Sequence, residues 1–187
     1  MKNRLKLLLL FLAAVICIAP SCKKSNPAPV DPLSQLPPAT QTGANTFGCL
    51  VNGQAFLPSS NFSSGQTPYQ CNYIYTNGGY NFFVEGSNQA GSNYISEISL
   101  GTVLLPIHEN QTLNLEDYNV SGKACGAYDI ILRDSYTTKS NVKGQLYISK
   151  LDSINQIVAG TFFFNAVNSN GDTVHVTNGR FDMKYTR

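Results

Sequence analysis

The last forty residues alternate between apolar and polar side chains and are interrupted by two short polar segments. Residues 144–151, 157–167 and 173–185 are the three candidate strands. The segments between them, 152–155 and 168–172, consist mostly of Asp, Asn, Ser and Gly, the residues that favour tight turns. Strands joined by loops this short pair in antiparallel fashion, because parallel neighbours need a long crossover. The sequence therefore predicts a three-stranded meander at this end.

The apolar residues of the last candidate strand change parity between Val176 and Phe181. One extra residue in a strand moves every later side chain to the other face of the sheet. We therefore predict a β-bulge around Asn178-Gly179.

Further hairpin signals lie upstream. Asn52-Gly53 separates two apolar runs, and Asn-Gly is a strong signal for a two-residue hairpin turn. Residues 69–76 and 80–85 form a second candidate hairpin around 77–79. Other candidate strands are 94–105 with a bulge at Gly101, 112–115, and 127–133 with its apolar centre Ile130-Ile131-Leu132.

These signals predict an all-β protein. Turns recur at short intervals, and no segment has the periodicity of a good amphipathic helix. The chain has 187 residues, of which 42% are hydrophobic, enough for one core. We predict one domain over residues 44–187, an antiparallel β-sandwich or small barrel of roughly 8–10 strands, with a lipocalin-like closed barrel as an alternative.

Residues 1–21 have the pattern of a signal peptide. A cationic start precedes a thirteen-residue apolar run over 7–19. A helix that crosses ~30 Å of hydrocarbon needs about 20 residues, so this run is too short to span a membrane. It has the length of a secretory apolar region, and small residues at Ala19 and Ser21 suit an export peptidase.

Ala19-Pro20-Ser21-Cys22 resembles the lipobox of bacterial lipoproteins. The resemblance implies that a diacylglyceryl group modifies the thiol of Cys22 and that the amine freed by cleavage is acylated. Several acyl chains make release from a membrane slow. The Leu that usually precedes the cysteine by three positions is Ala19 here. The alternative is an ordinary cleaved signal peptide and a soluble secreted protein.

The segment that follows has the composition of a tether, so residues 22–43 are predicted to be lipidated Cys22 and a Pro-rich spacer. Residues 23–43 hold five of the nine prolines of the chain. Such a segment favours extended polyproline II structure and buries no core. Its 21 residues would reach roughly 65 Å at about 3.1 Å per residue.

Two motifs resemble a family. TFGCLVNGQAFLP (46–58) opens the domain and GTFFFNAVNSNGDTVHVTNGRFDMKY (160–185) closes it. Together they are similar to uncharacterised envelope lipoproteins of Bacteroidota that share a domain of unknown function. The resemblance implies an all-β domain anchored in the outer membrane and implies no activity. Lys23-Lys24 stands where surface-exported lipoproteins of that group carry acidic residues, which favours a periplasm-facing protein.

Three cysteines remain beyond the signal peptide and Cys22, namely Cys49, Cys71 and Cys125. Export to an oxidising compartment permits one disulfide in any of the three pairings. The alternative is three buried thiols that pack as small hydrophobic groups.

No catalytic, cofactor-binding or metal-binding residue is predicted. The chain has no nucleophile elbow, phosphate loop or dinucleotide fingerprint, and His108 and His175 lack the spacing of a zinc site. Without residues 1–21 the formal net charge falls from +2 to −1, which argues against a nucleic-acid partner. The acidic residues leave open a glycoside hydrolase, whose two carboxyls would lie about 5–10 Å apart in a cleft.

Aromatic side chains are the remaining candidates for contacts with a ligand or partner. Tyr73 and Tyr75 share one face of a candidate strand, where they could stack on a ligand or fill the core. Phe162, Phe163 and Phe164 cannot all point the same way. If the outer two point inward, Phe163 lies on the opposite face and needs a cover or a partner.

These observations favour a non-enzymatic, lipid-anchored β-domain that binds a small molecule, glycan or protein in the envelope. One alternative is a hydrolase that acts on an envelope polysaccharide. A second is a structural or assembly subunit, with an exposed apolar patch around Phe163 or the 69–80 hairpin.

Overall fold

The computed structural model describes residues 30–59, 67–89 and 94–187. The predicted signal peptide, Cys22 and the first part of the predicted tether lie outside the described residues. Within them the chain forms one short 3₁₀ helix, η1 (Pro32–Gln35), and eleven strands. The strands are β1 (Thr46–Val51), β2 (Gln54–Phe56), β3 (Tyr69–Thr76), β4 (Gly79–Asn88), β5 (Ser96–Thr102), β6 (Gln111–Asn114), β7 (Ala124–Ile130), β8 (Asp134–Thr137), β9 (Gly144–Asp152), β10 (Ile157–Val167) and β11 (Thr173–Lys184).

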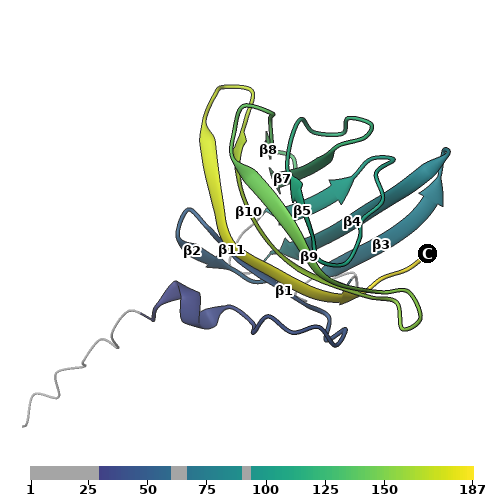
Figure 1. The fold of residues 1–187 in the computed structure, drawn as a ribbon. Coiled ribbons are helices and arrows are strands. Elements are labelled where there is room, and N and C mark those ends of the chain that lie inside the picture. The colour runs from purple at the N-terminus through teal and green to yellow at the C-terminus, as the bar shows by residue number, and fades with distance from the viewer. Residues whose placement is uncertain (1–29, 60–66, 90–93) are drawn as a thin grey trace, which may run out of the picture.

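The strands pair in antiparallel fashion in one curled sheet, in the order β2-β1-β11-β10-β8-β7-β5-β4-β3, and β6 and β9 branch from β10. The sheet curls so that β9, β10 and β11 lie opposite β3, β4 and β5 (Figure 1). Its end strands, β2 and β3, do not pair in the described residues, so the sheet is not closed into a barrel. A β-sandwich arrangement is thereby confirmed, and the lipocalin-like alternative is wrong.

The core fills the space between the two halves of the sheet. The ring of Phe82 on β4 lies 6.0 Å from that of Phe181 on β11, and Phe162 lies 5.4 Å from Phe47. All four rings are almost fully buried. Burial of each ring contributes about 1.5–3 kcal/mol. The contact between Phe82 and Phe181 joins the two facing halves of the sheet, whereas Phe47 and Phe162 pack together within one half, from the two strands that flank β11.

The predicted bulge is present in β11. Phe162 pairs with Gly179 and Phe164 pairs with Val176, so two residues of β11 stand opposite Phe163. One of them, Asn178, has a left-handed backbone with φ 54°. The bulge lets both halves of β11 bury their apolar side chains in the same core.

A segment from the end of the predicted tether packs on the sheet. We call residues 36–44 the N-terminal strap. Its Leu36 is buried, and an ideal Cβ on Gly48 of β1 would lie 2.8 Å from Pro37 Cδ. The carboxylate of Asp182 on β11 accepts hydrogen bonds from the Thr40 hydroxyl and from the Gly43 N–H, each at 2.7 Å. The packed part of the chain therefore starts before the expected domain boundary at residue 44.

Candidate functional site

A groove runs between the N-terminal strap and the face of the sheet that points away from the core. Its volume is about 760 Å³. η1 and the strap contribute Leu33 and Ala39 as one wall. The strands contribute side chains from β6, β9, β10 and β11, among them Thr112, Gln145, Tyr147, Thr161, Phe163 and Arg180. We call this hollow the outer groove.

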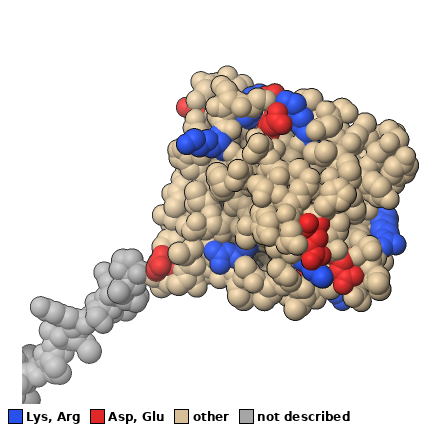
Figure 2. Space-filling model, viewed as in Figure 1, with Lys and Arg blue, Asp and Glu red and all other residues tan. Residues whose placement is uncertain are grey.

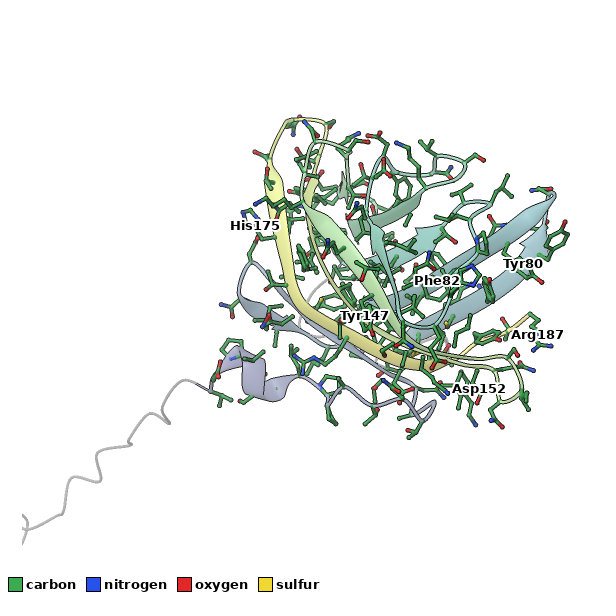
Figure 3. The ribbon with its side chains drawn as sticks, in the orientation of Figure 1. Tyr80, Phe82, Tyr147, Asp152, His175 and Arg187 are labelled. Atoms are coloured by element: carbon green, nitrogen blue, oxygen red, sulfur yellow. The ribbon has the colours of Figure 1, made fainter. Side chains whose placement is uncertain are left out.

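Two outward aromatic side chains contribute to its apolar surface, together with Leu33 and Ala39. Phe162 and Phe164 are buried, so strand alternation directs Phe163 outward, where 43% of its surface is exposed. This is the orientation expected from the sequence. Tyr147 is directed outward in the same way, between buried Leu146 and Ile148, and Figure 3 shows it on β9.

Amide and hydroxyl groups surround these rings. The Tyr147 hydroxyl lies 3.1 Å from Asn110 Oδ1, and Gln145 Nε2 lies 3.4 Å from Asn114 Oδ1. Arg180 is the cation among the lining residues, and its guanidinium donates to the carbonyls of Pro37 and Asn178, each at 3.3 Å. Arg180 therefore also fastens the strap that forms the wall of the groove.

A second hollow of about 500 Å³ adjoins the outer groove, and Gln145 and Phe163 line both. Glu116 and Lys143 also line this second hollow, and Glu116 forms an ion pair with Lys123 at 2.7 Å. On the side of the molecule in Figure 2, charged side chains lie toward the margins and uncharged ones occupy the centre. The site can therefore offer ring faces and hydrogen bonds along an elongated surface.

The predicted stacking residues lie elsewhere. Tyr73 packs against the core, with its ring 5.0 Å from that of Tyr80 and 6.0 Å from that of Tyr185. Tyr75 is 64% exposed and makes an edge contact with Tyr80 at 5.1 Å. Figure 3 shows Tyr80 near the tip of the β3–β4 hairpin. Tyr73 therefore supports the fold, and neither ring reaches the outer groove.

The three domain cysteines are free, buried thiols. Burial raises the pKa of the Cys71 thiol to about 12 and also raises the pKa values of Cys49 and Cys125. This matches the second alternative from the sequence, and no disulfide joins Cys49, Cys71 or Cys125. Thiols this hard to ionise are poor nucleophiles.

Two carboxylates lie close together on the outer face of β4 and β5. The Ser87 hydroxyl lies 3.4 Å from Glu85 Oε1 and 3.3 Å from Glu97 Oε1, in a hollow of about 360 Å³. Burial and the neighbouring charge of Glu97 raise the pKa of Glu85 to about 7. The Ser87 hydroxyl lies within reach of both carboxyls, in the place where a scissile bond or water would have to fit. The hydrolase alternative stays a prediction.

Replacing Glu85 with Gln will stabilise the protein above pH 7 by about 1 kcal/mol, a value reduced for the partial exposure of the side chain. The folded pKa of Glu85 lies above its unfolded value, so its stabilising protonation is complete below about pH 4.3 and lost as the pH rises through about 7. Urea denaturation at pH 5 and pH 8 measures the difference. Glu109→Gln, at the Lys150 ion pair, is the control and should give no gain at pH 8. An equal effect of Glu85→Gln at both pH values would contradict the prediction.

The histidines lie apart. The Nδ1 atom of His175 on β11 lies 2.8 Å from Asn165 Oδ1, and Figure 3 shows His175 away from the other labelled side chains. His108 lies in the loop before β6, where its N–H donates to Gln111 Oε1 at 2.8 Å. Among residues 30–59, 67–89 and 94–187, no three His, Cys, Asp or Glu side chains are placed to hold a metal ion.

No helix in the described part of the chain is long and apolar enough to cross a membrane.

Comparison with known proteins gave no match to a family model, a curated protein or a solved structure.

Proposed function

We propose that this protein is a lipid-anchored lipoprotein of the bacterial cell envelope whose non-enzymatic β-domain binds a glycan in the outer groove. The observation that carries the proposal is the pairing of Phe163 and Tyr147 with hydroxyl and amide groups along one open hollow. Small-ligand sites typically combine aromatic surface with a few placed polar groups.

A neutral sugar matches this lining better than other envelope ligands. Aromatic ring faces suit the C–H faces of a pyranose, and the side chains of Gln145, Thr112 and Thr161 can bond to hydroxyls. An acyl chain would leave those polar groups without partners, which is costly. A strongly anionic ligand would find one lining cation, Arg180, already engaged with two carbonyls.

The proposed lipid anchor at Cys22 is supported by the sequence alone. The apolar run over 7–19, the small residues before Cys22 and the following Pro-rich segment are together typical of an exported lipoprotein. Mass spectrometry of the mature N-terminus tests this point, with the mass of a triacylated cysteine expected. An unmodified peptide that begins at Cys22 would contradict lipidation.

Phe163→Ala will weaken oligosaccharide binding at least tenfold, because it removes the outward ring shared by the outer groove and the adjoining hollow. Calorimetric titration of the mature protein with neutral gluco- and galacto-oligosaccharides measures the effect. Tyr75→Ala removes an exposed ring on a different hairpin and should leave the affinity unchanged. Equal losses from both variants, or no binding by the native protein, would contradict the proposal.

A further inference from the structure

We propose that the glycan bound in the outer groove is the sugar headgroup of a lipid in the same membrane that anchors the protein. This inference rests on the proposed function, because it uses the anchor at Cys22 and the glycan groove. It adds the source of the glycan and the direction from which it arrives.

The first argument is the number of residues between the proposed anchor at Cys22 and the packed domain. Hydrogen bonds to Asp182 and from Arg180 fix the N-terminal strap to the sheet. η1 precedes the strap, and the side chain of Asp31 caps it by accepting from the Leu33 N–H. Only residues 23–29, seven in number, lie between Cys22 and the first described residue. Seven residues span at most about 25 Å. The domain is therefore held much closer to the bilayer than the roughly 65 Å that the whole predicted tether would allow.

The second argument is the place where the spacer joins the domain. Leu33 and Ala39 form a wall of the outer groove, and the described chain begins at Val30, just before η1. In Figure 1, η1 lies at one end of the domain, where it contacts β2. The short spacer therefore holds the groove at the membrane end of the domain, within reach of groups that project from the lipid surface.

The third argument is the match between the lining and a headgroup. Phosphate headgroups would call for several free cations, whereas the groove offers Phe163, Tyr147 and neutral polar groups around one engaged arginine. Neutral hexoses carry hydroxyls and C–H faces but no charge. The lining thus favours a glycosylated lipid over an anionic phospholipid.

Hydroxyl-radical footprinting of the lipidated, full-length mature protein in vesicles tests the inference. The vesicles are phosphatidylcholine alone, or with a tenth of the lipid as diglucosyl- or digalactosyldiacylglycerol, or with a tenth as phosphatidylglycerol. The readout is the oxidation of Phe163 relative to Tyr75, which is exposed on another hairpin and serves as an internal reference. We expect a glycolipid to reduce this ratio at least threefold, and phosphatidylcholine and phosphatidylglycerol to leave it unchanged.

Two variants identify the source of the effect. Tyr147→Ala, which leaves the reporter ring in place, should abolish the protection of Phe163. A twenty-residue Gly/Ser insertion between residues 29 and 30 should lower the effective concentration of headgroups at the groove about eightfold, because it falls with roughly the 3/2 power of tether length. A threefold protection of Phe163 should then be almost lost.

The remaining outcomes separate this inference from the proposed function. Equal protection by free disaccharide at the same total sugar concentration, with no effect of the insertion, would overturn the membrane source and leave glycan binding intact. Protection in phosphatidylcholine alone, or only with phosphatidylglycerol, would overturn headgroup recognition. No protection by either glycolipid or by free sugar would overturn both.

Discussion

Asp182→Ala will lower the free energy of unfolding by about 2–4 kcal/mol, because it leaves the buried Gly43 N–H and three partly buried donors without an acceptor. The Asp182 side chain has no exposed surface. Its carboxylate accepts from the Thr40 hydroxyl at 2.7 Å and from the backbone N–H groups of Thr42 at 2.9 Å, Gly43 at 2.7 Å and Ala44 at 3.3 Å. Chemical denaturation measures the loss.

Asp172→Asn is the matched control, because Asp172 is exposed in the turn before β11. Its effect should stay below about 1 kcal/mol. Asp182→Asn keeps the shape but turns an amide donor toward backbone donors, so it should also be strongly destabilising. We call the hydrogen bonds between Asp182 and the N-terminal strap the clasp. If Asp182→Ala unfolds with the native midpoint and its strap resists limited proteolysis, the clasp contributes nothing to stability.

The same carboxylate makes stability fall in acid. Burial raises the pKa of Asp182, but hydrogen bonds from Thr40 and from the N–H groups of Thr42, Gly43 and Ala44 outweigh it and hold the pKa below its usual value. The stabilisation is therefore present above the unfolded pKa of about 3.9 and is lost as the pH falls through the folded pKa. Midpoints measured between pH 2 and pH 5 should show a larger loss in the native protein than in Asp182→Asn, which keeps the other carboxyls with lowered pKa values.

Gly179→Ala will destabilise the protein by about 2–3 kcal/mol, because the bulge in β11 presses the Gly179 backbone onto the Phe162 ring. An ideal Cβ at Gly179 would lie 2.4 Å from two carbons of that ring. Phe162 is itself packed against Phe47 and Phe181, so it cannot move away. The shift would also displace Asn178 and Arg180 in the outer groove, so glycan affinity should fall with stability.

A double-mutant cycle checks that the ring is the cause. Phe162→Leu combined with Gly179→Ala should cost clearly less than the sum of the two single changes, because the smaller side chain leaves room for the new methyl group. At Gly53, where an added Cβ has no neighbour within 4 Å but φ is +80°, alanine should cost only about 1 kcal/mol of backbone strain. Additive effects at Phe162 and Gly179 would contradict this account.

Local signals were enough to predict much of the sheet. The Asn52-Gly53 turn joins β1 to β2, and the predicted strand 69–76 is β3. Parity in β11 located the bulge, and alternation placed Phe163 on the outer face. The same alternation, applied to residues 144–151, would have found Tyr147. Eleven strands form where roughly 8–10 were expected, because β8 is a four-residue segment of mostly polar composition that gave no strand signal, whereas β6 overlaps the predicted strand 112–115.

Other predictions failed where tertiary contacts outweigh local pattern. The strand expected over 127–133 ends at Ile130, and Leu132 is a fully exposed turn residue with φ 64°. Gly101 is not a bulge, because the register of β5 is continuous on both sides. Strand alternation alone predicts a solvated side chain for Asp182, yet a segment about 140 positions earlier in the chain covers it. No local pattern encodes a contact at that separation.

The clasp at Asp182 also decides how the domain bears mechanical load. A pull on the N-terminal end stretches the chain before η1 and then meets the hydrogen bonds that Thr40, Thr42 and Gly43 make to β11. β11 lies inside the sheet, paired with β1 on one side and β10 on the other. The load is therefore shared by the hydrogen bonds of two strand pairs. The force enters the sheet at an interior strand, so it does not separate the strands one by one from an edge.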